Sequence, residues 1–362
     1  MKVLLTGATG FIGSELLFEL LRSGDISQIV LIIRSSVNQT AQEKLDKIFG
    51  HWKKFSRICN PDDLKKIQII EEDIVKLSID SVPTDFDLIY HCAATTDLAT
   101  SLAEGRKKNV YLTQKVVMIG RRCSRLQRFV HFSTAFVAGK ATGLINPDVK
   151  PQRFRNHYER TKFESEHAVR DSGLKYTILR PSIVVGRSDT GYFYNLKVLY
   201  SVWKIWLKGV VPRAPLDKKA RVDFVPVDYV VNSAIELANN DDAVGKVLFL
   251  CAGTQAPYSW EVADVAARVF SVEFPKTLPP IVVSFYKYWP LNKTISYFTR
   301  TALESLHTHV PYLGSRTQQF DTSLTAQLLS NTGVDAPVFS EYGERIFEFC
   351  KNTNWGKRGM RL

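Results

Sequence analysis

Short apolar runs alternate along this chain with longer stretches in which apolar residues recur at helical intervals. The runs KVLL, QIVLIIRSS, IQIIEEDI and FDLIYHCAAT, all within residues 2–95, are typical of buried strands. The stretches SELLFELLRSG (14–24) and TAQEKLDKIFGHWKKF (40–55) are typical of helices. This alternation predicts an α/β fold with a doubly wound parallel sheet.

A glycine-rich turn follows the first predicted strand and comes directly before the first predicted helix. Its spacing is Gly7-x-x-Gly10-x-x-Gly13 in TGATGFIG, residues 6–13. Such a turn brings backbone N–H groups and a helix N-terminus close to a pyrophosphate. We expect Gly7 to make the turn, Gly10 to admit the phosphates, and Gly13 to let helix and strand pack. The alternative is a purely structural turn, but the flanking strand and helix favour a Rossmann-type dinucleotide site.

The ends of the next strands carry residues that bear on the choice of cofactor. Arg34 lies about 20 residues beyond the glycine turn, where an acidic residue selects NAD and an arginine accommodates the 2′-phosphate of NADP. NADP(H) is therefore favoured over NAD(H), with a solvated strand-end arginine as the alternative. Asp73 is placed to meet the adenine edge. The small residues Cys92, Ala93 and Ala94 follow a strand where the backbone must pass close to the cofactor.

Composition narrows the classes of partner and compartment. The 362 residues are 45% hydrophobic, and Lys and Arg exceed Asp and Glu by 12 charges. That excess favours anionic partners such as nucleotides, coenzyme A or an acidic acyl carrier protein. No nucleic-acid motif and no basic tail are present. Five scattered cysteines indicate neither a disulfide framework nor a metal site. A core strand at the start leaves no room for a signal peptide, so we expect a cytoplasmic location.

Two further segments carry residues suited to proton transfer. FVHFSTAFVAG, residues 129–139, predicts a strand that ends in adjacent hydroxyls, and NHYERTKFESE, residues 156–166, predicts a helix. Tyr158 and Lys162 are four residues apart, so they share one helix face, where the ammonium is expected to lower the phenol pKa and reach a nucleotide ribose.

These motifs occur together in the order typical of an extended short-chain dehydrogenase/reductase, which the chain resembles over roughly residues 1–255. The resemblance implies that Tyr158 is the general acid/base, that Lys162 orients the ribose, and that Thr134 binds the substrate oxygen, Ser133 being the less favoured candidate. Asn109 matches the helix asparagine that supports a proton relay. The implied cofactor-binding residues are Gly7, Thr9, Gly10, Phe11, Ile12, Gly13, Arg34, Asp73, Ile74, Cys92, Ala93, Ala94, Tyr158, Lys162, Pro181 and Ile183.

The second half of the chain resembles one branch of that family, the fatty acyl-CoA reductases and thioester reductases. The resemblance rests on LRPSIVVG, RVDFVPVDYVVNSAIELA and PYLGSRTQQFDTSLTAQLL (311–329), with a disordered-looking RSDTGYF turn between the first two. It implies a cofactor domain over residues 1–255, with 187–222 partly a substrate-binding insertion, and a substrate-binding and capping segment over 256–362.

An almost wholly apolar stretch, NLKVLYSVWKIWLKG (195–209), predicts a helix near the substrate. The favoured interpretation is a buried cover over the cleft. The alternatives, in order of decreasing preference, are the wall of an acyl channel and a membrane-surface contact. The aromatic-rich segment 282–298 can extend the same surface.

The sequence thus predicts an NADP(H)-dependent reductase of a hydrophobic acyl thioester or a related aldehyde or ketone. A nucleotide-sugar or steroid-like dehydrogenase or epimerase is the alternative enzyme. A redox-sensing NADP-binding regulator, which uses the glycine turn but not Tyr158, is the alternative from another class.

Overall fold

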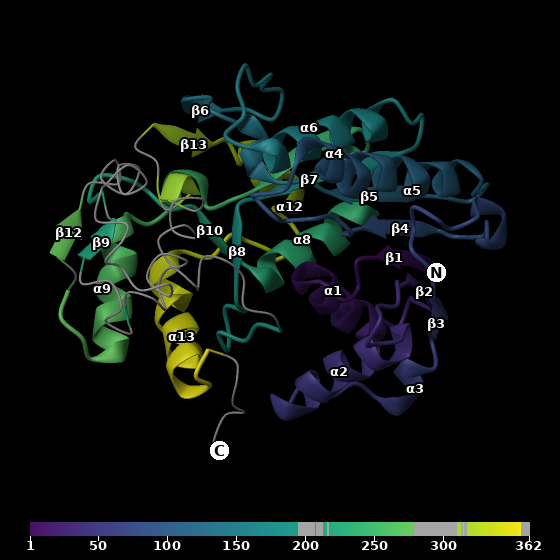
Figure 1. The fold of residues 1–362 in the computed structure, drawn as a ribbon, viewed down its shortest axis with the longest axis horizontal. Helices are drawn as coiled ribbons and strands as arrows, with labels where there is room; N and C mark the ends of the chain where they lie inside the picture. The colour runs from purple at the N-terminus through teal and green to yellow at the C-terminus, as the bar shows by residue number, and fades with distance from the viewer. Residues whose placement is uncertain are drawn as a thin grey trace.

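Seven parallel strands form the central sheet of the protein in a computed structural model (Figure 1). The structure describes residues 1–194, 207, 213–215, 217–274, 276–278, 310–312, 314 and 317–355. In spatial order the strands are β11 (Lys246–Leu250), β7 (Tyr176–Pro181), β5 (Arg128–Phe132), β4 (Leu88–His91), β1 (Lys2–Thr6), β2 (Gln28–Ile32) and β3 (Ile67–Ile70). The order reverses between β1 and β4, so the predicted doubly wound, Rossmann-type sheet is confirmed.

Helices cover both faces of this sheet (Figure 1). One face carries α1 (Phe11–Arg22), α2 (Ala41–Lys54) and α8 (Val227–Asn239), and beyond them α9 (Ser259–Phe270) and α13 (Phe339–Asn352). The other face carries α4 (Leu102–Gly105), the π-helical turn η2 (Arg106–Tyr111), α5 (Leu112–Arg121) and α6 (His157–Arg170). The short elements are α3 (Pro61–Leu64), η1 (Ile79–Ser81), η3 (Ala135–Ala138), η4 (Asp241–Ala243), η5 (Gly253–Gln255), η8 (Val310–Tyr312) and α12 (Ser323–Leu329).

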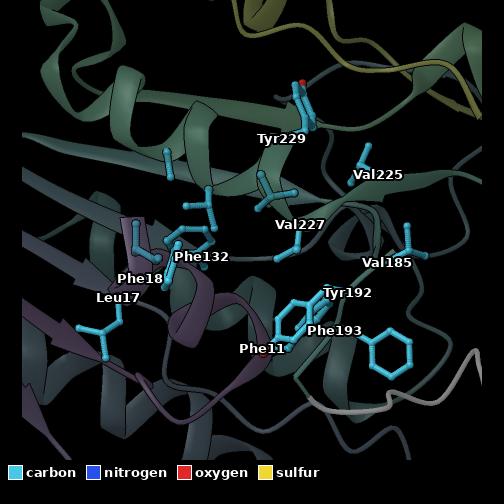
Figure 2. Close-up of a cluster of buried hydrophobic side chains, with 14 of the residues drawn as sticks. Phe11, Leu17, Phe18, Phe132, Val185, Tyr192, Phe193, Val225, Val227 and Tyr229 are labelled. Carbon is cyan, nitrogen blue, oxygen red and sulfur yellow. The ribbon is translucent and has the colours of Figure 1, made fainter. Parts of the chain in front are cut away.

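Side-chain alternation along the strands divides the interior into two cores. On β1, Val3 and Leu5 face the core under α1 and α8, whereas Leu4 faces the core under α5. Figure 2 shows part of the first core, in which Phe18 of α1 lies near Phe132 of β5 and beneath α8. Both faces of each central strand are therefore buried, which explains the continuous apolar runs in the sequence.

Three pairs of short parallel strands lie outside the central sheet. They are β10 (Phe224–Pro226) with β8 (Ile183–Val185), β12 (Lys276–Leu278) with β9 (Arg213–Pro215), and β13 (Gln318–Phe320) with β6 (Gly143–Ile145). The last pair joins residues more than 170 positions apart and brings the C-terminal part beside the segment that follows β5. The predicted division at residue 255 stays a prediction, although β11 before it and α13 after it pack into one body.

Two expectations need correction. The strand predicted over 28–36 ends at Ile32, so Arg34 lies in the loop that follows β2. The RSDTGYF turn is ordered and partly buried: Arg187 pairs with Glu19 at 3.1 Å and with Asp189 at 3.0 Å, and Phe193 is 1% exposed. The sequence around this turn suggested disorder because Glu19, which pairs with Arg187, lies on α1 and is far away in sequence.

Other expectations fall outside the part of the chain that the structure describes. The stretch 195–209 does so except for Leu207, which is buried, and 282–298 does so entirely. Among the described residues, no helix is long and apolar enough to span a membrane. All five cysteines are described, and each is a free thiol.

Candidate active site

A cavity of about 270 Å³ opens where β1, β4, β5 and β7 end. This is the edge of the sheet at which the strand order reverses, the usual ligand position in such folds. The cavity brings together most of the predicted site residues, from five separate segments: Gly7, Gly10, Phe11, Ile12, Gly13, Cys92, Ala94, Thr134, Tyr158, Lys162, Pro181 and Ile183.

The glycine turn forms one end of the cavity, and its geometry excludes side chains at two positions. Gly7 has φ +78°, and a Cβ there would lie 2.6 Å from the amide nitrogen of Ala93. A Cβ on Gly13 would lie 2.1 Å from the carbonyl oxygen of Gly7, so helix α1 can approach β1 only with glycine at this position. Gly7 thus serves the predicted turn and also a close contact with the loop after β4.

Gly10 fits the role of phosphate cradle. It is the N-cap of α1 and makes no side-chain cap, so the first amides of a twelve-residue helix face the cavity. A Cβ on Gly10 would meet only the carbonyl oxygen of Gly7 at 3.2 Å, because the rest of its surroundings is open. The residues present therefore fit a dinucleotide pyrophosphate.

Tyr158 and Lys162 lie one turn apart on α6, and both line the cavity. The Lys162 ammonium donates to the carbonyl oxygen of Phe132 at 2.7 Å, and burial lowers the pKa of Lys162 to about 8. Burial raises the pKa of Tyr158 to about 12, whereas a hydrogen bond with Thr134 acts in the lowering direction. The expected lowering of the phenol pKa by Lys162 is therefore not seen, because the ammonium is directed at the strand carbonyl.

The two adjacent hydroxyls after β5 have different partners. Ser133 donates to Glu166 at 2.6 Å, and Glu166 is itself held by two hydrogen bonds from Arg180, at 2.8 and 2.7 Å. Although burial raises the pKa of Glu166, the Arg180 guanidinium holds it below its usual value. Thr134 accepts weakly from the amide of Phe136 at 3.3 Å and also hydrogen-bonds the phenol of Tyr158. Thr134 is thus the hydroxyl that lies beside Tyr158 in the cavity, in line with the predicted preference.

Asn109 lies beside the cavity and not in its wall. It is in η2, where its side chain accepts from the amide of Thr95 at 2.9 Å and donates to Thr161 at 2.9 Å. The Thr161 hydroxyl in turn donates to the backbone carbonyl of Tyr158 at 3.2 Å. Asn109 therefore fixes the turn that carries Tyr158, and its predicted relay role stays a prediction.

A buried histidine, His91, connects this asparagine to the glycine turn. The Thr113 hydroxyl donates to the carbonyl of Asn109 at 2.6 Å, so it must accept from Nε2 of His91 at 2.9 Å. Nδ1 of His91 then accepts from the hydroxyl of Thr6 at 2.7 Å. Burial lowers the pKa of His91 to about 3, with Lys162 acting in the same direction. This neutral side chain joins the two ends of the cavity.

The predicted cofactor residues outside the cavity wall lie along the same sheet edge. Thr6, Ile32 and Ile70 pair across β1, β2 and β3, so the loops after these strands share one edge. Arg34 is exposed there, and its carbonyl accepts from Lys44 at 2.6 Å. The remaining predicted residues are Thr9 in the turn, Asp73, the buried Ile74, and Ala93. The carboxylate of Asp73 accepts from the amide of Val75 at 2.9 Å, and the amide of Ala93 donates to the hydroxyl of Thr6 at 3.4 Å.

Sequence reasoning missed part of the cavity wall. The additional lining residues are Thr96, Leu98, Phe132, Phe136, Ser182, Val184 and Tyr312, and Ser133, the less favoured hydroxyl, also lines the wall. Several of them adjoin predicted residues and were within reach of the motifs. Tyr312 lies within the motif 311–329, which was assigned to the predicted substrate-binding and capping segment without a site residue being named in it.

Comparisons with known proteins agree with this geometry. Residues 5–234 match the NAD-binding family described as "Male sterility protein". Fatty acyl-CoA reductase 1 of Rattus norvegicus is 29% identical over 320 residues, which cover 74% of this chain and 61% of that relative. The human counterpart is covered to 54%, so the chain spans between about half and three fifths of these relatives.

Solved structures show the same fold. The terminal R domain from the myxalamid PKS-NRPS biosynthetic pathway superposes with a TM-score of 0.79 at 24% identity, over 99% of this chain and 92% of that one. The UDP-glucuronic acid 4-epimerase of Bacillus cereus, bound to UDP-glucuronic acid and NAD, has a TM-score of 0.66 at 21% identity, over 97% and 99%.

The predicted dinucleotide-binding domain is confirmed by the match to an NAD-binding family. This chain belongs to the male sterility protein family of NAD-binding domains and has the fold of an extended short-chain dehydrogenase/reductase.

Proposed function

We propose that this protein is an NADP(H)-dependent reductase of hydrophobic acyl thioesters. One observation carries the proposal: Thr134, Tyr158 and Lys162 meet the glycine turn in a single cavity whose remaining wall is mostly apolar. The apolar side chains in that wall come from the loop after β4, from η3, from β8 and from η8: Leu98, Phe136, Ile183, Val184 and Tyr312.

The residues of this chain supply the proton and the orientation of the substrate. A bound nicotinamide supplies the hydride. The hydroxyls of Thr134 and Tyr158 bind the carbonyl oxygen, and Tyr158 delivers the proton as negative charge develops there. A phenol with pKa about 12 is protonated at neutral pH, which is the form that a reduction requires. Departure of the thiol, with one hydride and one proton consumed, then leaves an aldehyde.

The preference for NADP(H) rests on positive charge beyond β2. Arg34 is exposed at the edge of the sheet used by the cofactor, and the Lys44 ammonium lies against its carbonyl. Two cations at this place favour a 2′-phosphate over a free hydroxyl. Lys44 was not identified from the sequence, because it lies on α2, ten residues further along.

The substrate carrier is proposed from the charge of the chain. An excess of 12 positive charges favours coenzyme A or an acidic acyl carrier protein over a neutral ester. A cytoplasmic location remains part of the proposal. Contact with a membrane surface is the least favoured role of the stretch 195–209.

Turnover measurements test the function directly. NADPH oxidation is followed with saturated acyl-CoA substrates of increasing length, with NADH in parallel and with Tyr158→Phe as the inactive control. We expect kcat/KM to rise by up to about fourfold per methylene until the apolar wall is filled, since a buried methylene contributes about 0.8 kcal/mol. Added salt should weaken the capture of acyl-CoA more than that of a short neutral thioester.

The alternative enzyme has its own outcome in this assay. If kcat/KM does not change with chain length and UDP-glucuronic acid is turned over, the protein is instead an epimerase-like enzyme. That is the class of the structural neighbour bound to UDP-glucuronic acid and NAD. Cofactor binding without turnover of any substrate would favour an NADP-sensing regulator.

A further inference from the structure

Tyr312 is the only cavity-lining residue that comes from the described part of the chain after residue 255. It lies in η8, beyond the part of the chain that matches the family model. Its side chain contacts both segments that carry the reacting hydroxyls, which gives a specific place in the site to a residue of the predicted capping segment.

The Tyr312 hydroxyl binds the first turn of α6. It donates to the carboxylate of Glu159 at 2.7 Å and accepts from the side-chain Nδ2 of Asn156 at 2.6 Å. Asn156 is the N-cap of α6, and its side chain accepts from the amide of Glu159 at 3.0 Å. Tyr158 lies between these two residues, so the hydroxyl of Tyr312 closes a hydrogen-bonded ring around the turn that carries the proposed acid.

The Tyr312 ring packs on the other catalytic segment. It meets Phe136 edge to face, with ring centroids 4.8 Å apart and planes at 86°. Phe136 lies two residues after Thr134, and its amide donates to the Thr134 hydroxyl at 3.3 Å. One side chain thus joins the loop of Thr134 to the turn of Tyr158.

The segment around Tyr312 is itself anchored. Gln318 of β13 donates to the carbonyl oxygens of Gly139 and Ala141, at 3.1 Å each, and accepts from Arg155 at 2.9 Å. Burial and the Glu159 carboxylate raise the pKa of Tyr312, so its hydroxyl remains a donor at neutral pH. The Arg155 guanidinium lies 5.7 Å from the centre of the ring.

We propose that Tyr312 is a positioning residue that holds the turn of Tyr158 against the loop of Thr134 and so fixes the spacing of the two hydroxyls around the substrate oxygen. The inference rests on the proposed function for its catalytic consequence. The first turn of a helix frays readily because its amides lack intrahelical acceptors, and acid catalysis needs its donor held within about 0.5 Å. A tether from outside the helix answers that need.

The test compares Tyr312→Phe, which keeps the ring and loses the hydroxyl, with Tyr342→Phe. Tyr342 is buried in α13, outside the cavity, and its hydroxyl donates to the carbonyl of Phe224 at 3.2 Å, so it controls for the loss of a buried hydroxyl. The measurements are hydrogen exchange of the peptide spanning residues 154–163, kcat and KM with a long-chain acyl-CoA, and the Kd for NADPH.

For Tyr312→Phe we expect faster exchange in that peptide and a roughly tenfold lower kcat, the effect of losing one hydrogen bond to a charged group, with the Kd for NADPH unchanged. Tyr342→Phe should change neither the exchange of that peptide nor kcat. Equal exchange in the two variants, or faster exchange with an unchanged kcat, would overturn the inference. If the wild-type protein reduces no acyl thioester, the proposed function fails, while the exchange comparison still decides whether Tyr312 holds the turn.

Discussion

The two ends of the cavity are built in different ways. The cofactor end consists of residues 6–14 and the loop after β4, so most of its geometry lies within one strand–turn–helix unit. The substrate end is assembled from the loop after β5, the first turn of α6, β8 and η8, which are spread over residues 132–312. Local steric rules therefore dominate the first end, and tertiary contacts dominate the second.

This difference has a consequence for how each end fails. At the cofactor end a single added methyl group disturbs the site, because backbone approaches backbone. At the substrate end the reacting hydroxyls depend on side chains far away in sequence, so removal of a remote hydrogen bond is expected to lower turnover without loss of cofactor. Four substitutions separate these behaviours.

The largest expected effect comes from the substrate end. Tyr158→Phe removes the proton donor and leaves the glycine turn and Lys162 in place, so turnover should fall by roughly 10²–10⁴-fold while NADPH affinity changes little. Steady-state kinetics and a fluorescence titration with NADPH measure the two quantities. Near-normal turnover in this variant would remove Tyr158 from the proposed role, and a parallel loss of NADPH binding would show that the two ends are not separable.

Arg34→Asp probes the far part of the cofactor end. Replacing attraction by repulsion at a 2′-phosphate should weaken NADPH by roughly one to two decades and leave NADH nearly unchanged. Lys47→Asp, on the exposed surface of α2, makes the same change of charge away from the sheet edge and should alter both cofactors little. Equal losses for NADPH and NADH in the Arg34 variant would contradict its assignment.

Gly13→Ala tests the steric argument at the glycine turn. A methyl group 2.1 Å from the carbonyl of Gly7 forces α1 away from β1, and overpacking of this type costs roughly 1–3 kcal/mol of unfolding free energy. Gly50→Ala is the matched control, because Gly50 lies within α2 with no atom within 4 Å of an added Cβ.

The two glycine variants should change stability in opposite directions. Alanine at residue 50 should stabilise the helix by roughly 0.5–1 kcal/mol, since glycine is a poor helix former. Urea unfolding measures both changes, and a stable Gly13→Ala protein with normal NADPH affinity would mean that the turn tolerates a side chain.

The last test concerns the pH dependence of stability through His91, which joins the two ends. Its pKa is lowered to about 3 in the folded protein, so between about pH 6.5 and 3 the unfolded chain binds a proton that the folded one does not. The stability that His91 contributes is therefore complete above pH 6.5. It is lost as the pH falls below 6.5, by roughly 1.4 kcal/mol per pH unit.

His91→Gln keeps a donor and an acceptor but does not titrate. The unfolding free energy of this variant should depend less steeply on pH between 6.5 and 4, by the equivalent of about one proton. Part of the remaining slope comes from His131, which is buried on the neighbouring strand and whose pKa is also lowered by burial. An unchanged slope for His91→Gln would mean that His91 titrates normally in the folded protein.

Several parts of the site were predictable because they depend on short stretches of sequence. The glycine spacing, the strand ends at Cys92 and Thr134, and the four-residue interval from Tyr158 to Lys162 each follow from the period of one strand or helix. Arg34 was proposed from its distance to the turn, although β2 ends at Ile32, two residues before Arg34. The direction of the Tyr158 pKa was predicted wrongly, since burial outweighs a neighbour that points elsewhere.

The sequence by itself determined the alternation of strands and helices, and with it the doubly wound sheet and the turn at its switch point, because hydrophobic period and glycine sterics act over a few residues. Only the tertiary structure decided which hydroxyl after β5 lies beside Tyr158, that Asn109 supports α6 from outside the cavity, and that Tyr312 reaches the same helix from the far end of the chain. Such contacts join residues 33 to 153 positions apart, and no local pattern records which partners the folded backbone brings together.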